Sequence, residues 1–217
     1  MSTPTQTAMP TAPAPGAAGV TRSGIVPYRL TVGQFEKMID AGIFRDEDHV
    51  ELLGGLLVDK MVKNPPHNVA VIKLGTALRD KLPAGWFVNE EKSVQLSRWS
   101  GPEPDVAVVR GLPDDYGQRN PTAKAIGLIA EVADSSYAKD RGEKWRNYAA
   151  AKIPVSWIVN LPQRRIEVST SPSGRGKAAG YRDSRTYGAD DQVPVILEGR
   201  EVGWIKVSDV LPLIAKS

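Results

Sequence analysis

Two short apolar runs, each carrying one carboxylate, constrain this chain more than any other feature. Residues 125–134, AIGLIAEVAD, are almost continuously apolar, which is typical of a central strand buried on both faces. Residues 104–110, PDVAVVR, form a shorter run that opens with Asp105. Glu131 stands inside the longer run, and a carboxylate buried there alone would lose several kcal/mol of solvation. Each acid therefore needs a cation, which either the protein or a metal ion supplies.

Helix and strand patterns alternate around these two runs. The strongest local signals are a capping box formed by Thr31 and Gln34 and a hairpin turn at Gly54-Gly55. Helices are expected at 31–42, 65–83 and 140–152. Further strands are expected at 50–60, 86–98, 155–161, 165–170, 180–188, 192–197 and 201–207. We therefore predict an α/β fold in which helices flank a mixed β-sheet and the C-terminal part is rich in strands.

The domain organisation follows from length and composition. Of residues 1–24, 19 are Pro, Thr, Ala, Gly or Ser, so this segment cannot form a core and is predicted to be a disordered tail. It has neither the basic nor the apolar region of a signal peptide. Residues 25–217 are enough for one sizeable core, and we expect a single domain there.

Composition also limits the cofactors and the location. The chain has no cysteine, which excludes disulfides and thiolate metal sites and is compatible with the cytoplasm, where we expect the protein. Two histidines argue against a multi-histidine zinc or iron site. A bound metal should be a hard ion on oxygen ligands. No apolar stretch reaches the roughly 18 residues of a membrane helix, so no membrane partner is expected.

The charge balance gives no strong electrostatic case for nucleic acid. The net charge is only +3. One segment, residues 164–187, is basic, with six Lys or Arg residues against two acids. Two interpretations remain open for it: a solvated hairpin, or an arm that contacts phosphates.

The carboxylates themselves suggest a metal site. If the strands of Asp105 and Glu131 pair, the two acids can converge on one divalent ion, with waters and a substrate phosphate completing its coordination. Glu51, at the start of the apolar segment VELL, and Lys144, in the helix after the longer run, are further candidates. Each acid could instead form a structural ion pair or reach solvent, and Lys144 could pair with Asp140 on the helix surface.

Several segments together resemble a known family. PDVAVV, IAEVADSS and DRGEKWRNYAAAKIPVSWIVN, in this order, are similar to the Uma-type family of restriction endonucleases, within the PD-(D/E)xK nuclease superfamily. VELLGGLLV and PPHNVAVIKLGTAL also match, so the resemblance covers about residues 28–212. It implies a restriction-endonuclease-like fold and an endonuclease that hydrolyses DNA phosphodiester bonds with Mg²⁺ or Mn²⁺.

The resemblance also implies roles for single residues. Asp105 and Glu131 match the metal ligands, and Glu51 matches an acid that binds metal directly or through water. The usual lysine two residues after the second acid is replaced by Ala133. In the Uma-type pattern the lysine lies in the following helix, which gives the catalytic role to Lys144.

Three accessory residues complete this interpretation. Asp140 would hold Lys144 in place. His67 matches a histidine at the start of the long helix, either at the edge of the site or as a helix cap. Asp134 is either an additional ligand or a turn former.

Two other functions stay open at this point. The chain could be a nuclease-fold module that binds nucleic acid without cleaving it, or an interaction protein whose acids pair with arginines such as Arg141 or Arg146. The nuclease interpretation requires Glu51, Asp105, Glu131 and Lys144 to converge in one cleft. It also favours a homodimer, since cutting both strands of a duplex needs two sites.

Overall fold

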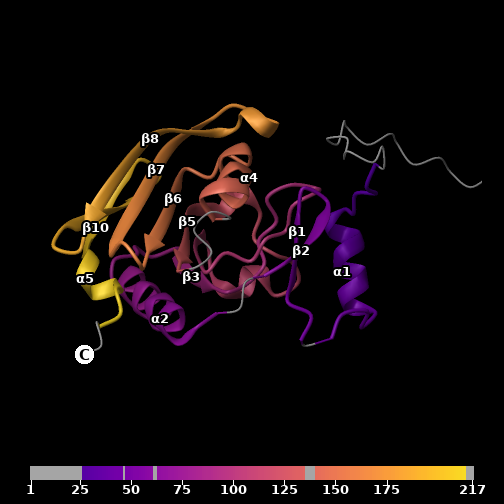
Figure 1. The fold of residues 1–217 in the computed structure, drawn as a ribbon, viewed down its shortest axis with the longest axis horizontal. Helices are drawn as coiled ribbons and strands as arrows, with labels where there is room; N and C mark the ends of the chain where they lie inside the picture. Colours follow the sequence, from indigo (N-terminus) through magenta and orange to yellow (C-terminus); the bar gives the residue numbers. More distant parts are fainter. Residues whose placement is uncertain (1–25, 46, 61–62, 135–139, 214–217) are drawn as a thin grey trace, which may run out of the picture.

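The main element of the fold is a six-stranded mixed sheet with the strand order β3-β4-β5-β6-β7-β8 (Figure 1). In this computed structural model the described residues are 26–45, 47–60, 63–134 and 140–213. Strands β5 and β6 run parallel, and the other neighbouring pairs of the sheet are antiparallel. The predicted α/β fold with a mixed sheet is confirmed, whereas the predicted tail, residues 1–24, lies outside the described residues.

The elements have the following bounds. The sheet consists of β3 (Trp86–Glu90), β4 (Val106–Arg110), β5 (Ile126–Ala133), β6 (Val155–Asn160), β7 (Arg165–Ser173) and β8 (Gly180–Gly188). Two separate hairpins are β1 (Val50–Leu53) with β2 (Leu56–Asp59), and β9 (Gln192–Leu197) with β10 (Arg200–Lys206). The helices are α1 (Val32–Asp40), α2 (Pro65–Arg79), α4 (Trp145–Ala150) and α5 (Val207–Val210). A π-helical turn, η3 (Asp140–Lys144), precedes α4, and short 3₁₀ turns are η1 (Pro113–Tyr116), η2 (Ala123–Ala125) and η4 (Gly176–Ala178).

The two apolar runs of the sequence form the middle of the sheet. All eight residues of β5 are buried, as are the first four of β4. Both faces of these strands are covered, and for this reason the runs are continuous rather than alternating. Side chains of α2, β9, β10 and α5 pack on one face, and Tyr148 of α4 packs on the other.

Local signals explain most of the helix boundaries. The Thr31 and Gln34 side chains form both halves of the predicted capping box at α1. Asn64 caps α2 through its side chain, ahead of the prolines of the first turn. The largest difference is in the strand expected over 86–98, which ends at Glu90, where Glu91 adopts a left-handed conformation with φ of 51°. The helix expected over 65–83 also ends earlier, at Arg79, and the strand expected over 165–170 extends to Ser173.

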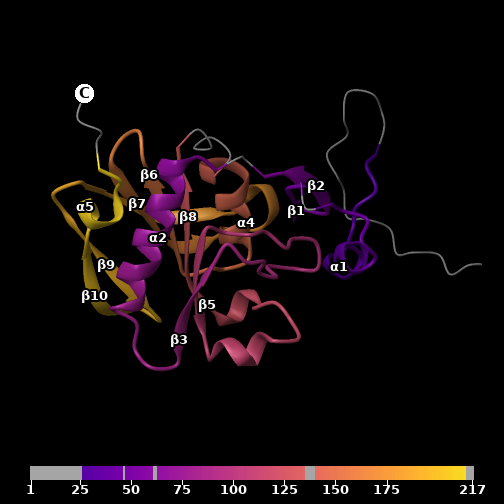
Figure 2. The same cartoon turned by 90° about the horizontal axis from the view of Figure 1, so that it is seen from below.

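The hairpins lie at opposite ends of the molecule. The β1–β2 hairpin and α1 lie at one end, and β9, β10 and α5 lie at the other (Figures 1 and 2). The basic segment 164–187 contains most of the β7–β8 hairpin, in which Arg182 and Arg185 are exposed. No helix in the described part of the chain has the length and apolar character needed to cross a membrane.

Candidate active site

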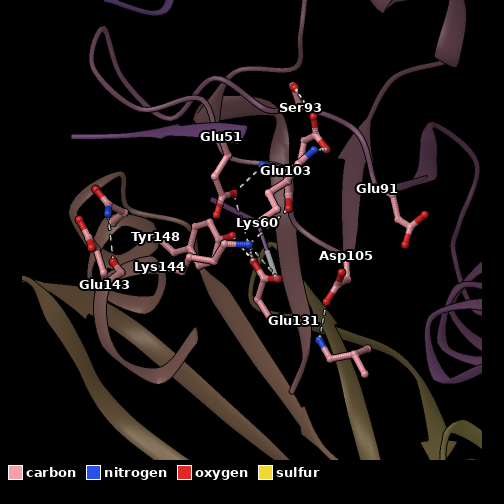
Figure 3. A network of polar contacts seen from close by, with 12 residues as sticks. Glu51, Lys60, Glu91, Ser93, Glu103, Asp105, Glu131, Glu143, Lys144 and Tyr148 are labelled. Carbon is pink, nitrogen blue, oxygen red and sulfur yellow. Dashed lines mark hydrogen bonds and ion pairs between the residues drawn. The ribbon is translucent and has the colours of Figure 1, made fainter. Parts of the chain in front are cut away.

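Lys144 forms the centre of a buried charge cluster. Its ammonium nitrogen lies 3.4 Å from Glu51 Oε2 and 3.2 Å from Glu131 Oε1. It also donates a hydrogen bond of 3.4 Å to the backbone carbonyl of Glu103. The relative exposures of Lys144, Glu51 and Glu131 are 7%, 1% and 3%. One buried cation is thus shared by two carboxylates from different sheets, β1 and β5 (Figure 3).

Tyr148 fixes the second carboxylate of this cluster. It follows Lys144 by one helical turn, and its hydroxyl donates a short hydrogen bond to Glu131 Oε1. Residues four apart lie on the same helical face, so the end of η3 and the following α4 present an ammonium and a hydroxyl to the same acid. Glu131 therefore has little freedom to rotate away.

Removing the Tyr148 hydroxyl should be measurable as a loss of stability. We expect Tyr148→Phe to lower the free energy of unfolding by about 1–3 kcal/mol, because a buried carboxylate loses a donor. Tyr116→Phe is the control, since the Tyr116 hydroxyl donates to the Arg110 carbonyl in an exposed setting. Urea denaturation of both variants checks the difference, and an equal loss in both would contradict it.

Asp105 lies beside this cluster with cations of its own. Its Oδ2 accepts a 2.8 Å hydrogen bond from the Val132 N–H and lies 3.2 Å from His67 Nε2. Its Oδ1 lies 3.1 Å from the ammonium of Lys63. Burial alone would raise the pKa of the Asp105 carboxyl, but the hydrogen bond and charge of His67, with Lys63 and Val132, lower this pKa from 3.8 to about 2.

The lowered pKa predicts a pH dependence of stability. A carboxyl that binds its proton more weakly when folded contributes stability above its unfolded pKa of 3.8, and the contribution is lost as the pH falls through about 2. We expect the stability advantage of the wild type over Asp105→Asn to shrink by about 2 kcal/mol over this window. Urea denaturation of both proteins across the acidic range measures it; a constant difference would show that Asp105 is not held as an anion.

Asp105 and Glu131 lie at the adjoining ends of two paired strands. Strands β4 and β5 pair with Val106 opposite Ala130. Asp105 directly precedes this pair and Glu131 directly follows it. Asp105 contacts His67 of α2, and Glu131 contacts Tyr148 of α4. Figure 3 shows both acids at adjacent strand ends. Lys144 thus contacts both Glu51 and Glu131, while Asp105 is paired with Lys63 and His67.

Sequence reasoning missed several charged residues around these acids. Lys63 pairs with Glu91 at 2.7 Å as well as with Asp105, and Lys60 pairs with Glu103 at 2.6 Å. Two signals in the sequence indicate them. Glu103 lies two residues before Asp105, and residues two apart in an extended segment point to the same side. Lys63 lies next to the start of a helix, where a positive charge is unfavourable unless an acid lies nearby.

The accessory residues have the following positions. His67 is not the cap of α2, since Asn64 has that role; His67 lies at the edge of the cluster, against Asp105. Asp134 accepts a hydrogen bond from the Asn64 side chain. The side chain of Asp140 lies outside the described part of the structure. Arg141 pairs with Glu167 rather than with a predicted site acid.

The donor set was compared with the needs of a hard divalent ion. Asp105 and Glu131 supply carboxylate oxygens at adjoining strand ends, and two such ligands with waters and a phosphate suffice for Mg²⁺. Within the described residues, no three His, Asp or Glu side chains form a ready metal-binding group. Lysine ammonium groups contact the carboxylates instead, at Asp105 and at Glu131. The carboxylate oxygens are thus of the kind that Mg²⁺ or Mn²⁺ prefers, and each acid has an ammonium as its counter-ion in this structure.

Comparison with known proteins identifies the family. The family model Uma2, described as "Putative restriction endonuclease", matches residues 32–205. The chain belongs to the Uma2 family. All the acids and lysines of the cluster fall within the matched range, so the Uma2 resemblance seen in the sequence is confirmed.

A solved structure shares the Uma2 chain's fold. It is a crystal structure from Anabaena variabilis, described as "a putative nuclease belonging to DUF820". The TM-score is 0.60 at 13% sequence identity, with 83% of this chain and 97% of that chain covered. At this identity the likeness shows the nuclease-like fold alone. The search of curated proteins gave no match.

Proposed function

We propose that this Uma2 protein is a metal-dependent endonuclease that hydrolyses DNA phosphodiester bonds. The observation that carries the proposal is the buried cluster in which Lys144 lies between Glu51 and Glu131, with Asp105 at the neighbouring strand end. Burying this many charges costs several kcal/mol per ion, and a well-packed apolar core would serve stability as well or better. A chemical role is the better explanation for their presence. The family description, "Putative restriction endonuclease", supports DNA as the substrate class.

In the proposed mechanism, Asp105 and Glu131 would hold Mg²⁺ or Mn²⁺, which would supply Lewis-acid polarisation of the phosphate. Lys144 offers a fixed positive charge next to Glu131, where it can stabilise the negative charge that develops on the phosphate. Tyr148 orients Glu131, and His67 orients Asp105. Glu51 holds the Lys144 ammonium and is a further ligand candidate.

The test is cleavage of supercoiled plasmid by the purified protein with Mg²⁺, Mn²⁺ or EDTA. We expect nicked or linear DNA with either metal and intact plasmid in EDTA. We also propose a symmetric homodimer, so sedimentation of the same sample should give twice the mass of the chain. Specific duplex binding with no cleavage under either metal would contradict the enzyme and favour a nuclease-fold module that only binds nucleic acid. The position of Lys144, away from the usual place two residues after the second acid, is the feature that favours this alternative.

A further inference from the structure

Lys63 is a partly exposed lysine that contacts a proposed metal ligand. Its ammonium lies 3.1 Å from Asp105 Oδ1 and 2.7 Å from Glu91 Oε1. The Lys63 side chain is 33% exposed, whereas that of Asp105 is 7% exposed. A partly exposed ammonium thus contacts one oxygen of this buried carboxylate, while the Val132 N–H donates to the other oxygen.

We propose that Lys63 is a counter-ion that a divalent metal displaces from Asp105, and that the released ammonium binds a phosphate of the substrate. This inference rests on the proposed function. It adds that metal binding and DNA binding are coupled through one side chain.

The two oxygens of Asp105 support the first half of the proposal. Oδ2 is held by Val132 and His67, while Oδ1 is the atom in contact with Lys63. A divalent ion that binds Oδ1 must therefore displace the Lys63 ammonium from this oxygen. The apparent Kd for the metal equals the intrinsic Kd divided by the fraction of molecules in which Asp105 is not paired with Lys63. If the ion pair is formed about nine-tenths of the time, the apparent Kd for the metal is about tenfold higher.

The chemistry of lysine supports the second half. The ammonium is a compact charge on a flexible four-carbon stem, so it can leave one anion for another nearby without backbone movement. The ammonium contacts two carboxylates at once, those of Asp105 and Glu91. A bound phosphate draws Lys63 away from Asp105 and thereby favours the metal. By linkage, the metal favours the phosphate to the same extent.

Lys60 provides a matched control. It lies three residues away, in the same connection between β2 and α2, and its side chain is 24% exposed. Its ammonium pairs at 2.6 Å with Glu103 rather than with a proposed metal ligand. Lys60→Gln removes the same charge from the same segment and leaves Asp105 with its own counter-ion.

The first experiment is calorimetric titration of Mn²⁺ alone into four full-length proteins. We expect Lys63→Gln to bind Mn²⁺ about tenfold more tightly than the wild type. Lys63→Arg, which keeps the cation, and Lys60→Gln should bind as the wild type does. Thermal unfolding of each protein establishes that it is folded before titration.

The second experiment measures duplex binding in Ca²⁺ at several salt concentrations. A lysine that contacts a phosphate contributes about one unit to the slope of log affinity against log salt. We expect Lys63→Gln to lose about one unit of this slope and Lys60→Gln to keep it.

The outcomes separate the two proposals. Unchanged or weaker Mn²⁺ binding by Lys63→Gln, or an unchanged salt slope, overturns the role of Lys63 while the nuclease proposal stands. A wild type that binds neither Mn²⁺ nor duplex overturns the proposed function, and this inference with it.

Discussion

Asp105→Asn is expected to slow metal-dependent plasmid cleavage about a thousandfold, the equivalent of about 4 kcal/mol in the activation barrier. Asparagine keeps the shape and one oxygen of the side chain, but it loses the charge that holds a hard cation. The Val132 N–H can still donate to that oxygen, so the local backbone is preserved. Initial rates of plasmid nicking at saturating Mn²⁺ measure the effect.

Glu167→Gln is the matched control for this substitution. Glu167 is also a buried carboxylate of the sheet, and it pairs with Arg165 at 2.7 Å and with Arg141. It lies in β7, apart from the proposed metal ligands. We expect the variant to lose stability but to keep its cleavage rate at a temperature at which it is folded. Equal losses of rate in Asp105→Asn and Glu167→Gln would show that buried charge, not metal binding, explains both.

Lys144→Ala is expected to abolish cleavage and to lower the free energy of unfolding by about 3–5 kcal/mol. The loss of stability is large because Glu51 and Glu131 stay buried while the ammonium that they share is removed. Arg146→Ala, an exposed cation of the same helix, should cost little. Urea denaturation of the two variants measures the difference.

A second substitution keeps this expectation testable if Lys144→Ala does not fold. Adding Glu51→Gln removes one of the two uncompensated charges, so the double variant should be more stable than Lys144→Ala alone. It should remain inactive in plasmid cleavage. A Lys144→Ala protein with wild-type stability, or with wild-type cleavage, would contradict the role assigned to this lysine.

The fold could be predicted from the sequence wherever the signal was local. The capping box at Thr31 and the Gly54-Gly55 turn depend only on nearby residues, and both formed as expected. The apolar runs of β4 and β5 were recognisable because strands covered on both faces cannot alternate. The end of β3 at Glu90 was missed, since nothing in the apolar pattern indicates a left-handed residue at Glu91.

The candidate site could be predicted only in part. An acid within an apolar run indicates that a cation must lie nearby. The sequence does not indicate which residue supplies that cation, because the partner comes from another helix, strand or loop. The sequence left Lys144 a choice between Asp140 and the site acids, and only the packing of α4 on β5 places it against Glu131. Lys63 was missed for the same reason: it meets Asp105 across 42 residues of chain.

The most direct test of the metal site is a crystal of the protein grown with Mn²⁺, with diffraction data collected near the manganese absorption edge. We expect an anomalous peak about 2.2 Å from oxygens of Asp105 and Glu131, with the Lys63 ammonium moved away from Asp105. A fully occupied Mn²⁺ elsewhere, with both lysines still paired to their carboxylates, would contradict the proposal that these acids bind the catalytic ion.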